Sequence, residues 1–121
     1  MLLKGKAHCY GDYFNTDLHL SAKYRPAGTT LEELVQTMLI NIDPDFSKRV
    51  APGDFLVAGE FFGADSSRED AVEVLKKAGI AAVIAKSFAH LFFRNAINLG
   101  LLVIQADTGG IATNHLLEVD V

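Results

Sequence analysis

The sequence lacks the residues that mark several large classes of protein. Its single cysteine, Cys9, allows no internal disulfide and cannot alone hold a zinc ion or an iron–sulfur cluster. No apolar run approaches the roughly 20 residues that span a bilayer. The opening five residues are too short for a signal peptide. We therefore expect a cytoplasmic protein with no membrane partner.

An excess of basic residues is also absent. The chain has 121 residues, of which 11 are Lys or Arg and 15 are Asp or Glu, giving a net charge of -4. A general nucleic-acid-binding protein normally has a basic face, so we expect no nucleic-acid partner. Half of the residues are apolar, and the length is typical of one domain with a buried core.

The second half of the chain alternates apolar runs with amphipathic segments. Strands are expected at residues 54–59, 81–85 and 101–104, and helices at residues 71–80 and 88–99. Gly79 and Gly100 follow the two helices and are typical of helix ends. This alternation predicts an α/β fold with a parallel βαβαβ core and right-handed crossovers.

Other segments of the chain also have patterns that predict local secondary structure. Residues 2–10 and 116–121 predict strands, and residues 11–17 a polar turn before a short strand or bend. A helix is expected from Thr29–Thr30 to about Ile42, because threonines followed by acidic residues are typical of a helix start. Asp43 before Pro44 predicts a capped further turn.

The segment from Phe61 to Asp70, FFGADSSRED, joins a predicted strand to a predicted helix. A helix N-terminus presents unpaired N–H groups and a partial positive charge, so it favours anions. With Ser66, Ser67 and Arg68 beside it, this start could bind a carboxylate or phosphate. The same residues are equally typical of an N-cap formed by either serine.

In parallel sheets, ligands gather at the carboxyl ends of the strands. This rule predicts that the Gly63–Arg68 loop, Lys86–Ser87 and Ala106–Asp107 share one edge. Ser87 is expected to cap the helix that follows it. The residues by themselves thus indicate an α/β domain with an edge suited to anions.

Several motifs then follow one another in a fixed order. They are Gly11-Asp12-x-x-Asn15-Thr16-Asp17, Asp43-Pro44-Asp45-Phe46, Pro52-Gly53-Asp54, Val57-Ala58-Gly59-Glu60-x-Phe62-Gly63-x-x-Ser66-Ser67-Arg68-Glu69 and Ala82-Val83-Ile84-Ala85-Lys86-Ser87-Phe88-Ala89. In this order they resemble the small subunit of 3-isopropylmalate dehydratase (isopropylmalate isomerase), over about residues 7–106. The resemblance implies the swivelling β/β/α domain of the aconitase superfamily, with flanking helices.

The resemblance also implies an enzyme subunit. In this superfamily another subunit or domain holds a [4Fe–4S] cluster, and the small domain supplies the opposite wall of the site. By resemblance, this chain binds no metal and pairs with a cluster-bearing large subunit as a heterodimer or heterotetramer. The implied activity is that of a hydro-lyase, inactive without its large subunit. The enzyme that the resemblance implies interconverts 2- and 3-isopropylmalate by dehydration and rehydration in leucine biosynthesis. The alternatives are a homoaconitase or other hydroxy-acid hydro-lyase subunit, and a non-catalytic homologue.

The resemblance assigns roles to particular residues. Ser66 matches the serine that removes a proton from the carbon next to a carboxylate. Ser67 and Arg68 match residues that bind a substrate carboxylate, where Arg can donate two parallel hydrogen bonds. Asp17 matches an active-site aspartate, and Arg25 lies in the loop that contacts the variable substituent of the substrate. From the residues alone, Asp17 could also be a turn residue and Arg25 a solvated cation.

The loop departs from the family pattern Asn-Phe-Gly-Cys-Gly-Ser-Ser-Arg-Glu-His. Phe61, Ala64, Asp65 and Asp70 replace the Asn, the Cys, the second Gly and the His. At a distance of roughly 4 Å, the carboxylate of Asp65 would repel an anionic substrate by about 1 kcal/mol or more. Residues 1–121 predict one aconitase C-terminal-like domain that is shortened at its C-terminus relative to the family.

Overall fold

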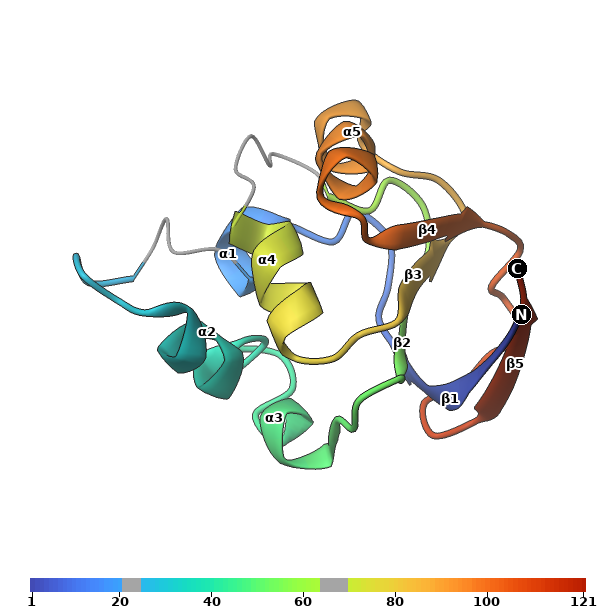
Figure 1. Cartoon of the computed structure of the whole chain (residues 1–121), viewed down its shortest axis with the longest axis horizontal. Coiled ribbons are helices and arrows are strands. Elements are labelled where there is room, and N and C mark those ends of the chain that lie inside the picture. Colours follow the sequence, from blue (N-terminus) through green and yellow to red (C-terminus); the bar gives the residue numbers. More distant parts are fainter. Residues whose placement is uncertain (21–24, 64–69) are drawn as a thin grey trace.

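The computed structural model describes residues 1–20, 25–63 and 70–121. These residues form a five-stranded sheet in the order β4-β3-β2-β1-β5 (Figure 1). The strands are β1 (Leu2–Cys9), β2 (Phe55–Val57), β3 (Ala82–Ala85), β4 (Leu102–Gln105) and β5 (Leu116–Asp120). The helices are α1 (Thr16–His19), α2 (Leu31–Thr37), α3 (Phe46–Arg49), α4 (Asp70–Lys77) and α5 (His90–Leu99).

The predicted βαβαβ core is confirmed in β2-α4-β3-α5-β4. Strand β3 pairs in parallel with β2 on one side and with β4 on the other. Strand β1 extends the parallel set, because it pairs in parallel with β2. Gly79 and Gly100 both have left-handed backbone, with φ of 89° and 80°, as expected of residues that end helices.

The central strands contribute to two apolar cores because successive side chains point to opposite faces of a sheet. Leu56 and Val83 join the larger core, which the helices cover. Phe55 and Ile84 join a smaller core on the opposite face, which also contacts Val119 of β5. Figure 1 shows the helices gathered on one side and β5 at the opposite margin.

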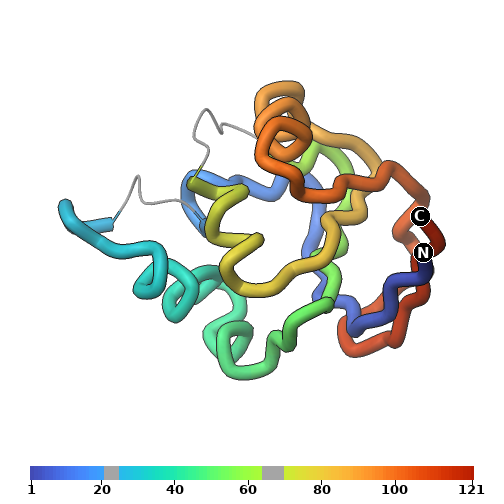
Figure 2. Tube along the Cα trace, viewed as in Figure 1, coloured from blue at the N-terminus to red at the C-terminus, as the bar shows by residue number. Residues whose placement is uncertain are grey.

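The two ends of the chain lie side by side. Strand β5 pairs antiparallel with β1, and Leu2 lies opposite Asp120. The N-terminal amine of Met1 donates to Val121 O at 2.8 Å. Figure 2 shows both termini at the β1–β5 margin, away from α1 and α2.

Helix α2 starts as predicted but ends earlier. Thr30 is the N-cap in a capping box with Glu33, so the predicted start is confirmed. The helix ends at Thr37 instead of Ile42. Its C-cap Met38 leaves the helical region with a ψ of 141°, Leu39 follows with a left-handed φ of 62°, and both side chains are buried in the core.

Two local expectations in this half of the chain are wrong. The segment expected to be a turn and then a strand or bend contains the short helix α1, whose N-cap Asn15 accepts from Leu18 N at 3.0 Å. Asp43 does not cap α3, which begins at Phe46 after Asp45. The carboxylate of Asp43 accepts hydrogen bonds from the side chains of Tyr10 and Arg49 instead.

Candidate functional site

Two turns lie side by side at the carboxyl ends of β1 and β2. Tyr13 N donates to Glu60 O at 2.7 Å, and Gly63 N donates to Phe14 O at 3.0 Å. These bonds hold the turn before α1 against the turn after β2. We call the segments that meet here, at the carboxyl ends of the parallel strands, the carboxyl edge.

Ser87, just beyond β3, holds the other side of the turn after β2. Its Oγ accepts from Phe61 N at 2.8 Å, and its carbonyl accepts from Phe62 N at 3.0 Å. Helix α5 has Ala89 at its N-cap and no side-chain cap bond. The prediction that Ser87 caps this helix is therefore wrong, because its hydroxyl fixes the neighbouring turn.

The segment after β4 completes the carboxyl edge. Ala106 N donates to Ala85 O at 2.9 Å, and the buried Thr108 Oγ1 donates to Ala58 O at 2.7 Å. An open hollow of about 410 Å³ beside it is lined by Lys86, Gln105, Ala106 and Asp107. Within the described residues, the predicted meeting of these segments at one edge is confirmed.

Asp17 lies in the first turn of α1, at the carboxyl edge, and is only 1% exposed. It lies three positions after Phe14, whose carbonyl accepts from Gly63 N. Asn15, and not Asp17, supplies the side-chain cap of this helix. Asp17 is therefore buried close to the start of the loop, and its catalytic role stays a prediction.

Ser66, Ser67, Arg68 and the unusual Asp65 lie outside the described residues. The structure describes both ends of their segment. Gly63 is fixed at the carboxyl edge, and helix α4 begins at Asp70. The roles that the resemblance assigns to these four positions stay predictions.

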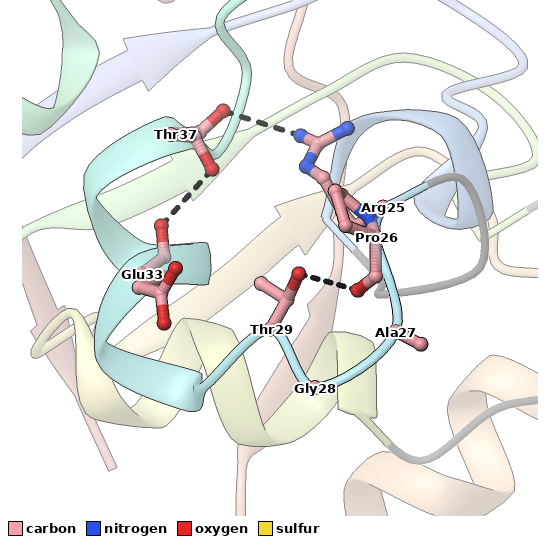
Figure 3. A pocket seen from close by; sticks show the side chains of 7 residues that line it. All are labelled: Arg25, Pro26, Ala27, Gly28, Thr29, Glu33 and Thr37. Carbon is pink, nitrogen blue, oxygen red and sulfur yellow. Dashed lines mark hydrogen bonds between the residues drawn. The ribbon is translucent and has the colours of Figure 1, made fainter.

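Arg25 lies beside the C-terminal end of α2. Its Nη2 donates to Thr37 O at 3.3 Å (Figure 3), so it is held by the protein and is not a fully solvated cation. Burial, and then the charge of Arg25, lowers the pKa of His19 below its ordinary 6.5, so His19 is neutral at pH 7. A hollow of about 250 Å³ here is lined by Arg25, Pro26, Ala27, Gly28, Thr29, Glu33 and Thr37.

A buried polar network at the opposite end of β2 was not predicted. His8 is fully buried, and its Nε2 lies 2.8 Å from Asp54 Oδ2. Arg49 Nε donates to His8 Nδ1 at 3.3 Å, so in this arrangement Nδ1 is the acceptor and Nε2 faces Asp54 as the donor. No local sequence pattern indicates this pair, because Asp54 lies 46 positions away from His8 in the sequence.

The network continues to Asp43 and joins three segments. Arg49 donates to both carboxylate oxygens of Asp43, and Tyr10 Oη donates to Asp43 Oδ2 at 2.7 Å. The hydrogen bonds from Arg49 lower the pKa of Asp43. Burial raises the pKa of Asp54, but hydrogen bonds from His8, Ala51 N and Lys6 N outweigh it and lower the pKa overall. We assign these residues a structural role.

Replacing Asp54 should destabilise the fold in a pH-dependent way. We expect Asp54→Asn to lower the free energy of unfolding by about 3 kcal/mol at pH 7, because it removes one partner of a buried charged network. The folded-state pKa of Asp54 lies below the ordinary 3.8. The contribution of the Asp54 carboxylate to the free energy of unfolding is therefore present above pH 3.8. It is lost as the pH falls through the lower folded-state pKa.

Urea unfolding over an acidic pH series checks this prediction. The difference between the wild type and Asp54→Asn should shrink toward low pH. Asp120→Asn is the matched control, because Asp120 is 87% exposed. A difference that stays constant with pH would contradict the prediction.

The described residues do not fit an iron–sulfur cluster. Cys9 Sγ donates to Ile111 O at 3.6 Å, and burial raises the pKa of the thiol. No group of three or more His, Cys, Asp or Glu side chains within residues 1–20, 25–63 and 70–121 is placed to hold a metal ion. None of the described helices is long and apolar enough to cross a membrane.

Comparison with known proteins gives matches along nearly the whole chain. Residues 12–109 match the model of the aconitase C-terminal domain. The chain is 48% identical to 3-isopropylmalate dehydratase small subunit 2 of Archaeoglobus fulgidus, a match that covers 99% of this chain and 73% of that protein. It is also 48% identical to the methanogen homoaconitase small subunit of Methanocaldococcus jannaschii, over 99% of this chain and 70% of that protein.

A solved structure agrees with these matches. The crystal structure of a 3-isopropylmalate dehydratase from Methanocaldococcus jannaschii superposes with a TM-score of 0.90 at 48% identity. The alignment covers 99% of this chain and 71% of that chain. The similarity therefore extends to the carboxyl edge as well as to the core.

Proposed function

This chain belongs to the aconitase C-terminal domain family, among the small subunits of its hydro-lyases, and from that membership we propose its function. We propose that it is the small subunit of a 3-isopropylmalate dehydratase-type isomerase, which interconverts 2- and 3-isopropylmalate by dehydration and rehydration. Its partner is a large subunit that carries a [4Fe–4S] cluster. The chain by itself supplies one wall of the active site.

The observation that carries the proposal is the meeting of two family motifs at the carboxyl edge. The hydrogen bond between Gly63 N and Phe14 O brings the start of the serine loop beside the turn that leads to Asp17. These motifs lie far apart in the sequence. Their meeting supports a single substrate site built from both.

Within this site Ser66 takes the proton from the carbon next to a substrate carboxylate. A free serine hydroxyl is too weak a base, so its alkoxide needs nearby donors, such as the N–H groups at a helix start. Ser67 and Arg68 hold the carboxylate of the substrate. When bound in the large subunit, the cluster supplies a Lewis acid for the substrate hydroxyl.

Co-expression with a candidate large subunit tests the proposal. We expect a stable complex that hydrates the unsaturated intermediate of isopropylmalate isomerisation, whereas the isolated chain has no activity. Assays on isopropylmalate, homoaconitate and citraconate separate the substrate classes. The absence of a complex, together with no turnover of any of the three, would contradict the proposal.

A second candidate substrate is a hydroxy-tricarboxylic acid, as for a homoaconitase. Arg25 favours it, because a guanidinium could bind a third carboxylate. The bond from Arg25 to Thr37 O uses only one of its five donor hydrogens. If the substrate is isopropylmalate, whose substituent is apolar, the remaining N–H groups of Arg25 would donate to water.

Arg25→Leu distinguishes the two candidates. If the substrate is a tricarboxylate, we expect kcat/KM for it to fall by about 100-fold, because a charged hydrogen bond contributes up to about 3 kcal/mol. If the substrate is isopropylmalate, kcat/KM should change by less than about threefold. Steady-state assays of the complex on both substrates provide the measurement, with Lys48→Leu on the exposed surface of α3 as the control.

A further inference from the structure

Two exposed aromatic residues at the carboxyl edge have an unusual backbone. Tyr13 and Phe61 have φ of 55° and 57°, in the left-handed region that disfavours residues with a Cβ. Their rings contact each other, with centroids 6.0 Å apart. Tyr13 is 67% exposed and Phe61 is 44% exposed. We call them the aromatic pair.

Burial or residue type explains the other non-glycine residues with this backbone. Within residues 1–20, 25–63 and 70–121 there are two others, Leu39 and Asn114. Leu39 is fully buried, so core packing offsets the strain. Asn114 is a residue type that tolerates the left-handed region. Neither explanation applies to the aromatic pair, which is exposed and bulky.

The backbone of the aromatic pair is fixed by the carboxyl edge itself. Tyr13 N donates to Glu60 O, and Phe61 N donates to Ser87 Oγ at 2.8 Å. These bonds fix the backbone of both residues close to Gly63, and the two rings pack against each other. Strained backbone that holds exposed apolar groups in place is typical of binding surfaces.

We propose that the aromatic pair is a contact of this chain with the cluster-bearing large subunit, an inference that rests on the proposed function. The large subunit is the favoured occupant, because it must face the carboxyl edge to complete the site. Exposed tyrosine and phenylalanine rings are enriched at protein interfaces. Strain in the free chain is then offset when the partner buries the rings.

Asparagine substitutions in the aromatic pair should raise the thermal stability of the isolated chain and weaken its binding to the large subunit. Tyr13→Asn and Phe61→Asn place a tolerant residue in the left-handed region, so we expect the Tm of the isolated chain to rise, by roughly 3 °C for the double variant. The Kd for the large subunit should weaken by at least about tenfold. Leu116→Asn on β5 is the control, because Leu116 is 81% exposed and lies opposite Lys6 of β1, outside the carboxyl edge.

Thermal unfolding of the isolated chain and titration with the purified large subunit give both values. A higher Tm with a weaker Kd supports the contact. An unchanged Kd with a raised KM would place the aromatic pair against the substrate and overturn the proposal. A lowered Tm with an unchanged Kd would show that the rings serve the fold, which also overturns it. If the wild-type chain binds no large subunit, the proposed function fails and the contact fails with it.

Discussion

Ser66→Ala should lower the turnover of the assembled enzyme by about 1,000-fold or more, because general-base catalysis contributes up to roughly four orders of magnitude. The serine hydroxyl is the proposed base, and alanine offers no proton acceptor. Assembly with the large subunit should be unchanged, since the substitution removes one oxygen atom. Steady-state kinetics and titration with the large subunit measure the two effects separately.

Two serine variants serve as controls for this experiment. Ser67→Ala should mainly raise KM, because Ser67 is proposed to bind a carboxylate and takes no part in proton transfer. Ser47→Ala lies in α3, outside the carboxyl edge, and should leave kcat and KM unchanged. Turnover of Ser66→Ala close to the wild-type rate would show that another group removes the proton.

Gly63→Ala should destabilise the protein by about 4 kcal/mol and displace the loop that follows. Gly63 has a φ of 95°, and a Cβ there would lie 2.7 Å from Phe92 Cγ, inside van der Waals contact. Phe92 is fully buried, so it cannot move aside. The overlap and the left-handed backbone each contribute roughly 1–3 kcal/mol. Urea unfolding of the isolated chain measures the loss.

Turnover of the complex should fall with this variant, because the displaced loop includes Ser66. Gly110→Ala is the matched control, since a Cβ there would meet no atom within 4 Å and its φ is not in the left-handed region. We expect Gly110→Ala to change stability by less than about 0.5 kcal/mol. Wild-type stability of Gly63→Ala would contradict the packing that the structure shows around Phe92.

Local signals predicted most of the fold. The capping box of Thr30 and Glu33 and the left-handed glycines Gly79 and Gly100 involve residues within one or two helical turns. Their effect depends little on the rest of the chain, so the sequence predicts them. The end of α2 was not predictable in this way, because core packing overrides the helical periodicity at Leu39.

The hydrogen-bond partner of a side chain is harder to predict from the sequence when a distant segment can bind that side chain as well as a nearby helix start. Ser87 and Asp43 both precede helices and could each have been caps. In the folded chain Ser87 accepts from Phe61 N, 26 positions away, and Asp43 accepts from Tyr10, 33 positions away. Long-range bonds of this kind form only when tertiary packing brings the partners together.

The sequence by itself determined the α/β class, the parallel core and the family, because periodicity, helix ends and ordered motifs are properties of short segments. Only the tertiary structure placed Gly63 beside Phe14, paired His8 with Asp54 and set Tyr13 against Phe61. Each of these pairs joins residues that lie dozens of positions apart. Their geometry depends on the packing of the whole sheet, which no local pattern specifies.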